Sequence, residues 1–187
     1  MSETRDKRRR NDLDLFVLAL IESGISTPYE LKTAAGLSPG ATIPTLRRLL
    51  EESLVLQGKP GPRGRTGHKI TVEGRRYLNR AWKDLIVDGP SGDLDADLRI
   101  ALLAIWVGGD RELAVDFLRQ SATRKRNFID TVETPDQPAS LPPLALWYSR
   151  LRSAAAEALK KGESAVTLAM AKSLPRGPRA FKTKPRP

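Results

Sequence analysis

The sequence contains no cysteine and a single histidine, His68. Without cysteine, the chain has no disulfide, no thiolate ligand for a metal and no thiol nucleophile. A lone histidine argues against a zinc site. No apolar run approaches the roughly 20 residues that a membrane helix needs. The apolar stretch after the basic N-terminus carries Asp12 and Asp14 and has no small-residue cleavage site, unlike a signal peptide. We therefore expect a cytoplasmic protein.

Signatures of catalysis are also missing. We find no nucleophile–base pair and no paired carboxylates, and the glycines of segment 58–67 match neither a P-loop nor a dinucleotide-binding motif. Asp93, Asp95 and Asp97 alternate as in a calcium loop but lack its central glycine and terminal glutamate, so they suit the acidic first turn of a helix. We expect no enzymatic activity, no cofactor and no metal.

The net charge of +10 is unevenly distributed. Residues 1–90 carry 16 basic and 11 acidic side chains, residues 91–174 carry 11 of each, and residues 175–187 carry five basic and no acidic ones. This pattern favours a polyanion-binding front half, a neutral assembly region and a basic tail. The alternative is an ordinary soluble protein with a high isoelectric point.

A break in the pattern at Asp88–Gly92 divides the chain. The expected parts are a basic N-terminal arm (1–11), a head (12–87), a helical region (93–173) and a disordered basic tail (174–187).

The head begins with signals for three helices. Leu13–Ile21 is apolar nearly all round and predicts a buried helix. Thr27, Pro28 and Glu30 form a capping box with proline at the first helical position, so a short helix should run from there to Ala35. The start signal is repeated at Ser38-Pro39, before a helical pattern over 43–54. Two short helices joined by a tight turn predict a helix-turn-helix.

Pro44 lies inside the last of these helical patterns. An interior proline removes one backbone hydrogen bond. The regular helix should therefore begin near Ile43 or bend at Pro44.

Two short strands, 54–57 and 68–72, flank a loop rich in glycine, proline and basic residues. They predict a wing, and a further helix should run from about Thr71 to Leu85. The expected fold is mainly α: a winged helix-turn-helix with a three-helix head and a two-stranded wing, followed by a helical region.

The second half shows apolar stripes at helical spacing. A stripe from Leu94 to Ile105 ends at Gly108, and Asp110 should cap the next helix. A proline-rich loop is expected over 134–143. The longest helix of this half should follow over 144–159, with a short last helix over 163–173.

A helix-turn-helix places its second helix in the major groove of DNA. If Ile43, Leu46 and Leu49 face inward, Thr45 and Arg48 face outward. Arg48 would then contact a guanine and Thr45 a thymine methyl or a phosphate, while basic wing residues would follow the backbone. The predicted DNA-contacting residues are Ser38, Ala41, Thr42, Pro44, Thr45, Arg47, Arg48, Lys59, Arg63, Arg65 and Lys69. The alternative is a solvated helix face and a loop kept soluble by its charge.

The apolar segment 13–21, followed by segments 27–31 (TPYEL), 37–49 (LSPGATIPTLRRL) and 69–78 (KITVEGRRYL), resembles the PadR family of bacterial transcription regulators. That family typically shows Gly-Tyr-Glu-Leu, then Leu-Ser-Pro-Gly with a Pro-x-Leu-x-Arg-Leu continuation, and Leu-Thr-x-x-Gly after the wing. Members of the family also have a proline at the position of Pro44, inside the helix. They usually have glycine in place of Pro28 and often tyrosine in place of Ile43.

The resemblance implies a homodimeric repressor that binds a pseudo-palindromic operator and dimerises through C-terminal helices. The residues expected at the dimer interface are Leu94, Leu98, Leu102, Leu144, Trp147 and Leu151. These leucine stripes also suit an intrachain core. Some members of the family bind aromatic or cationic molecules, for which Trp82, Trp106 and Trp147 are candidate pocket residues.

Two other functions fit the same features. A sequence-tolerant architectural or partition protein would use the same head with its basic termini as arms. A protein-interaction module would instead favour a neutral helix face and an acidic wing, the opposite of what this sequence shows.

Overall fold

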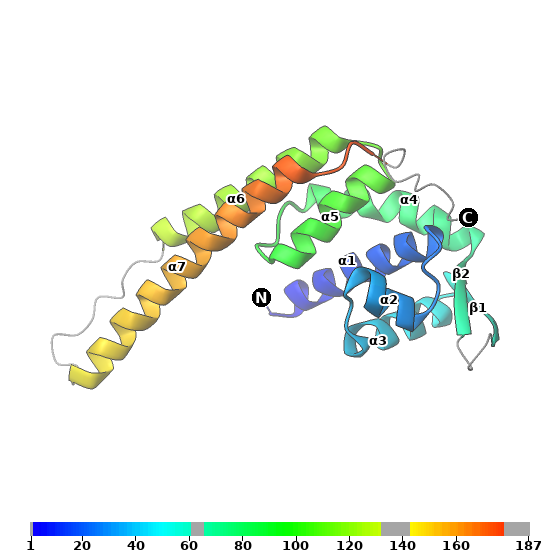
Figure 1. The fold of residues 1–187 in the computed structure, drawn as a ribbon, viewed down its shortest axis with the longest axis horizontal. Coiled ribbons are helices and arrows are strands. Elements are labelled where there is room, and N and C mark those ends of the chain that lie inside the picture. The colour runs from blue at the N-terminus through cyan, green and yellow to red at the C-terminus, as the bar shows by residue number, and fades with distance from the viewer. Residues whose placement is uncertain (1, 61–65, 132–142, 178–187) are drawn as a thin grey trace.

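The computed structural model describes residues 2–60, 66–131 and 143–177, and side chains over 12–59, 66–127 and 157–177. This part of the chain is mainly helical, with one two-stranded antiparallel sheet (Figure 1). In chain order the elements are α1 (Ser2–Glu22), α2 (Pro28–Ala35), α3 (Pro39–Glu51), β1 (Val55–Pro60), β2 (Thr66–Ile70), α4 (Val72–Val87), α5 (Leu94–Trp106), α6 (Arg111–Thr131) and α7 (Pro143–Ser173). None of the helices described is both long and apolar enough to cross a membrane.

The start of α2 has the predicted capping box. The Glu30 amide donates to the Thr27 hydroxyl at 3.2 Å, and the Thr27 amide donates to the Glu30 carboxylate at 2.9 Å. Gly36 ends the helix with a φ of 67°, a left-handed conformation that glycine adopts without strain. These local signals place α2 and the turn that leads to α3.

Helix α3 begins at Pro39 and continues through Pro44 to Glu51. The expected late start near Ile43 is therefore wrong, because the helix already includes the four residues before it. Ser38 closes the first turn, because its hydroxyl accepts from the Ala41 amide at 3.3 Å and its carbonyl accepts from the Thr42 amide at 3.0 Å. Pro44 has no amide hydrogen, so the Gly40 carbonyl lacks its usual helical hydrogen bond. Gly40 is exposed, so water can bind this carbonyl instead.

The two strands pair in register from Val55↔Ile70 to Gln57↔His68. The second strand ends earlier than predicted because Thr71 caps α4, its hydroxyl accepting from the Gly74 amide at 2.9 Å. The lone histidine has a structural role. The His68 amide donates to the Ser26 carbonyl at 2.8 Å, and its buried ring lies 3.1 Å from the same oxygen. These contacts attach β2 to the segment that precedes α2.

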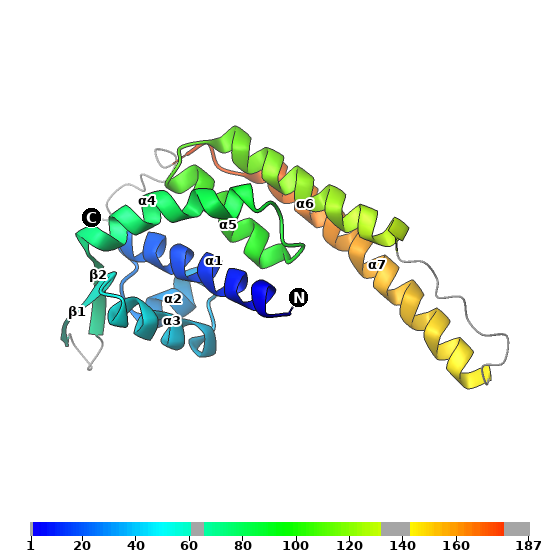
Figure 2. The same cartoon turned by 180° about the vertical axis from the view of Figure 1, so that it is seen from behind.

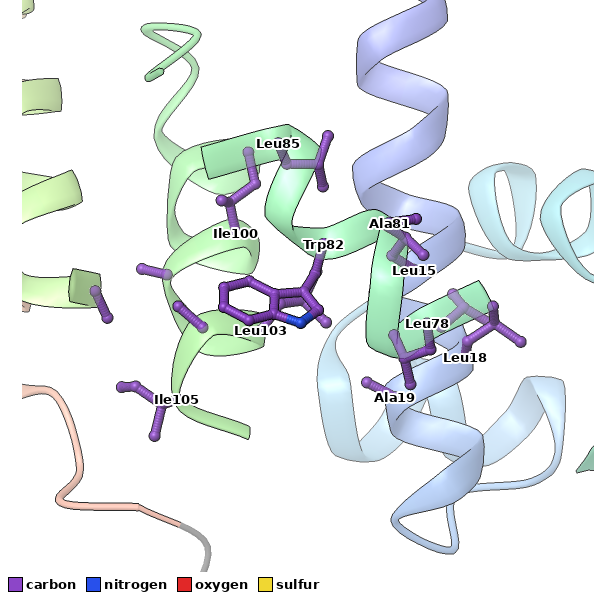
Figure 3. Packing of buried hydrophobic residues seen from close by; sticks show 14 of the residues in the cluster. Leu15, Leu18, Ala19, Leu78, Ala81, Trp82, Leu85, Ile100, Leu103 and Ile105 are labelled. Atoms are coloured by element: carbon purple, nitrogen blue, oxygen red, sulfur yellow. The ribbon is translucent and has the colours of Figure 1, made fainter. Parts of the chain in front are cut away.

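Helix α1 lies at the centre of a single hydrophobic cluster. Helix α5 packs against both α1 and α4, and the buried Trp82 ring of α4 lies beside Leu103 of α5 (Figure 3). The segment at 88–92 is thus a turn between helices that share a core. The predicted boundary does not separate two cores, and α5 belongs with the head.

Helices α6 and α7 form a long antiparallel pair that extends away from α1, α2 and α3 (Figures 1 and 2). Asp110 caps α6 as predicted, accepting from the Leu113 amide at 2.8 Å. Helix α7 is continuous over 143–173, so the two predicted helices are one. Gly162 does not interrupt it, because packing on α6 outweighs the cost of about 1 kcal/mol that glycine adds in a helix interior.

A buried polar network joins the head to this helix pair. Asp97 of α5 accepts from the Ser121 hydroxyl of α6, and Lys125 Nζ donates to Ser121 at 3.1 Å and to Thr167 of α7 at 3.1 Å. The Lys125 side chain is 1% exposed, and this burial lowers the pKa of Lys125. The hydrogen bonds fix α5, α6 and α7 relative to one another.

The N-terminal arm expected over 1–11 is instead part of α1, which extends back to Ser2. At the first described side chain of this helix, Asp12 accepts from Arg99 Nε of α5 at 2.7 Å. The Asp12 carboxylate is buried, and this burial raises the pKa of Asp12. The predicted loop before α7 and the predicted tail lie mostly outside the described residues.

Candidate nucleic-acid interface

Helix α3 lies at the edge of the molecule, on the side away from α6 (Figure 1). Its outward face, here called the α3 face, consists of Gly40, Ile43, Pro44, Arg47 and Glu51 at helical spacing. Ile43 is 59% exposed and the Arg47 side chain is 74% exposed, whereas Pro44 is half-buried. The face is therefore apolar in its first half and carries one cation, Arg47, and one anion, Glu51, in its second half.

The predicted orientation of this helix is wrong. Thr45 is 1% exposed and Thr42 is fully buried, so neither hydroxyl reaches the surface, and Ile43 points outward. Leu46 and Leu49 do face the core. The prediction placed Ile43 inward because its side chain is apolar, and it placed the threonines outward because theirs are polar. A threonine hydroxyl can be buried when the helix backbone satisfies it, and the Thr42 hydroxyl donates to the Ser38 carbonyl at 3.1 Å.

Arg48 is half-buried and is held against α1 instead of projecting into solvent. Its guanidinium donates two hydrogen bonds to the carboxylate of Asp14 in α1 and a third to the Thr45 hydroxyl at 3.1 Å. Such a forked ion pair fixes both side chains. Arg48 thus joins α3 to α1, contrary to the expectation that it faces outward toward a base.

Arg47 has the opposite surroundings. Among the described side chains it forms an ion pair with Glu51, one turn further along, at 3.9 Å between two largely exposed groups. Pairs of this kind contribute little and break readily. Of the other predicted residues on α3, Ser38 is exposed and caps the helix, while Ala41 is half-buried.

The hairpin extends beside the C-terminal end of α3 (Figure 1). Lys59 of β1 and Lys69 of β2 are exposed, as is Leu56, which pairs with Lys69 across the strands. Arg63 and Arg65 lie outside the described residues. The α3 face and this hairpin surface together form a surface with several cations.

Helix α4, which follows β2, adds exposed basic residues. Arg75 and Arg76 are paired with Glu22 at 3.4 Å and Glu73 at 3.6 Å. Both arginine side chains are largely exposed to solvent.

The predicted dimer residues fall into two groups. Leu94, Leu98 and Leu102 are half-buried on α5, and Leu102 packs against the core. The side chains of Leu144, Trp147 and Leu151 lie outside the described set. An exposed, uncharged surface on α7, here called the α7 stripe, was not predicted from the sequence. The helical spacing of its small and apolar residues could have indicated it. The α7 stripe consists of Ala158, Leu159, Gly162, Ala165, Val166 and Ala169.

The predicted tryptophan pocket is not supported by Trp82. Its ring is buried in the core and lies so close to Gly108 that a side-chain carbon there would come within 2.6 Å of it. Trp106 is half-buried against the same core, and the Trp147 side chain is outside the described set. An open groove on α6 is lined by residues that include Asp116, Arg119 and Thr123 and no tryptophan. The described side chains also form no cluster of three metal-ligating groups.

Comparison with protein-family models and with curated proteins found no match to this chain. The likeness to the PadR family therefore rests on the sequence segments quoted above.

Proposed function

We propose that this protein is a dimeric DNA-binding transcriptional regulator with a winged helix-turn-helix, and that it represses rather than catalyses. In this proposal α3 enters the major groove and the β1–β2 hairpin lies along the backbone as the wing. The observation that carries it is the α3 face: an exposed helix surface at the molecular edge, following a tight turn and flanked by a basic hairpin.

Electrostatics favour a polyanion as the partner. The excess of basic residues in the first 90 positions attracts a phosphate backbone, and Arg47, Lys59 and Lys69 expose their cations on or beside the α3 face. Arg47 suits a phosphate contact, because the described ion pair that would compete for its guanidinium is the weak one with Glu51.

The α7 stripe supports the dimer. Leu159 is 68% exposed and Val166 is 45% exposed, which is unusual for large apolar side chains on a helix that already packs against α6. Leu144 and Leu151 precede the stripe in the sequence at seven-residue steps, a spacing typical of helix pairing. A two-fold dimer through α7 would present two α3 helices to a pseudo-palindromic operator.

The test is selection of binding sites from a randomised duplex library, followed by titration of the selected and a scrambled duplex over a salt series. A sequence-specific regulator should prefer the selected duplex by about 10³-fold or more at moderate salt. Equal affinities with a steep salt dependence would instead identify a sequence-tolerant architectural protein, which the basic tail also suits. Absence of DNA binding would contradict both.

A matched pair of variants locates the contact. Arg47→Ala should weaken DNA binding and reduce the slope of log affinity against log salt by about 1. Arg119→Ala is the control, because Arg119 is also a largely exposed helical arginine paired with an acidic neighbour one turn away, but lies on α6. Equal effects of the two substitutions would contradict the assignment of α3.

A further inference from the structure

We propose that Ile43 reads the C5 methyl group of a thymine in the major groove. This inference rests on the proposed function and specifies how α3 would recognise sequence. Arg48, the side chain best suited to hydrogen-bond a guanine, is held by Asp14 and Thr45.

The α3 face offers few hydrogen-bonding groups to a base. Through its first two turns, the exposed or half-buried positions after the Ser38 cap are Pro39, Gly40, Ala41, Ile43 and Pro44. None of these side chains donates or accepts a hydrogen bond. Ser38 already accepts from the Ala41 amide, and Arg47 lies further along the helix. Readout by this part of the helix must therefore use apolar contact.

Thymine supplies the complementary group. Its C5 methyl is the one apolar substituent that the four standard bases display in the major groove. Ile43 is the largest side chain in the first two turns of the α3 face, and at 59% exposure it contributes little to the core. An isoleucine in that position can bury a methyl group that water would otherwise surround.

Gly40 provides an independent indication of close approach. A side-chain carbon at this position would meet no neighbouring group within 4 Å, and its φ does not lie in the left-handed region. Neither packing nor backbone conformation requires glycine here, although alanine favours a helix more. The missing side chain lowers the surface one turn before Ile43, which lets a nucleic acid come nearer to the helix.

The experiment uses the full chain and the selected duplex, with each thymine replaced in turn by deoxyuridine, which keeps its base pairing but lacks the methyl group. We expect one thymine in each half-site at which this change weakens binding about fourfold, the factor for one buried methyl group. Ile43→Ala should bind the thymine and deoxyuridine duplexes equally. Because Ile43 is exposed, the variant should keep the melting temperature of the wild type.

Leu56→Ala is the matched control, since Leu56 is an equally exposed aliphatic side chain (61%) on the neighbouring strand and should leave the thymine preference intact. Gly40→Ala tests the close approach separately. It should keep or raise stability and weaken binding about fivefold or more, because an added methyl group would collide with the DNA.

The outcomes separate the two proposals. If the protein selects a duplex but no thymine position responds to deoxyuridine, or Ile43→Ala keeps the response, methyl readout is overturned while the regulator proposal stands. If no duplex is preferred over random sequence, the regulator proposal fails and methyl readout falls with it.

Discussion

Arg47 and Arg48 are adjacent in the chain but have opposite surroundings. Arg47 is largely exposed, whereas Arg48 is 33% exposed and joins α3 to Asp14 of α1. At the scale of single residues, their contributions to binding and to stability should therefore separate. The sequence alone does not distinguish them, because both are arginines in the second half of an amphipathic helix.

We predict that Arg48→Ala lowers the free energy of unfolding by about 1–2 kcal/mol, because it leaves the Asp14 carboxylate without its charged partner. Arg47→Ala should change it by less than about 0.5 kcal/mol. Urea denaturation measures both values, and Asp14→Ala combined with Arg48→Ala gives the coupling between the two side chains. A larger loss of stability for Arg47→Ala than for Arg48→Ala would contradict the assignment of Arg48, and not Arg47, to the contact between α3 and α1.

At the scale of elements, the position of α2 depends on its capping box. We predict that Thr27→Ala costs about 1 kcal/mol of stability, because the Glu30 amide and carboxylate both lose a partner. Thr33→Ala is the control. Its hydroxyl donates only to the Tyr29 carbonyl on the exposed side of the same helix, so the change should stay within about 0.5 kcal/mol.

The stabilisation that this capping box contributes should depend on pH. Backbone hydrogen bonds from Thr27 and Ser26 lower the pKa of Glu30 below its ordinary value of 4.5. A lowered carboxylate pKa means that the folded state favours the charged form, so the stabilisation is present at neutral pH and disappears as the pH falls through the lowered pKa. The stability difference between wild type and Glu30→Gln should accordingly shrink on acidification. A difference that is constant with pH would contradict this role.

The elements also show which features sequence patterns can predict. Caps at Thr27, Ser38 and Asp110 were predictable because each depends on hydrogen bonds between residues three positions apart. The rotation of α3 was not, because it is set by contacts with α1 that pair residues distant in the chain. The continuity of α7 through Gly162 likewise depends on α6, a partner that local propensity ignores.

At the scale of the whole molecule, the exposed apolar surface of α7 is the contact that the proposed dimer would use. We predict that Leu159→Glu combined with Val166→Glu converts a dimer into a monomer, because each glutamate would bury a charge in the contact between two copies. Light scattering over a range of protein concentrations measures the mass.

Lys161→Glu is the control for this prediction, because Lys161 is exposed on the same helix but outside the α7 stripe. It should leave the mass unchanged. A wild-type chain that is monomeric at high micromolar concentration would contradict the assigned interface.

The network around Lys125 has a consequence for the geometry of binding. It bonds α5 of the head to both helices of the α6–α7 pair through groups that are buried and mutually satisfied. If α7 carries the dimer axis, the two heads are attached to that axis through short, stiff connections instead of flexible linkers. Each base pair inserted between half-sites turns one of them by about 35° around the DNA axis. A stiff dimer cannot follow that rotation. The angle between the two half-sites around the DNA axis, their torsional phase, therefore becomes part of what the protein recognises.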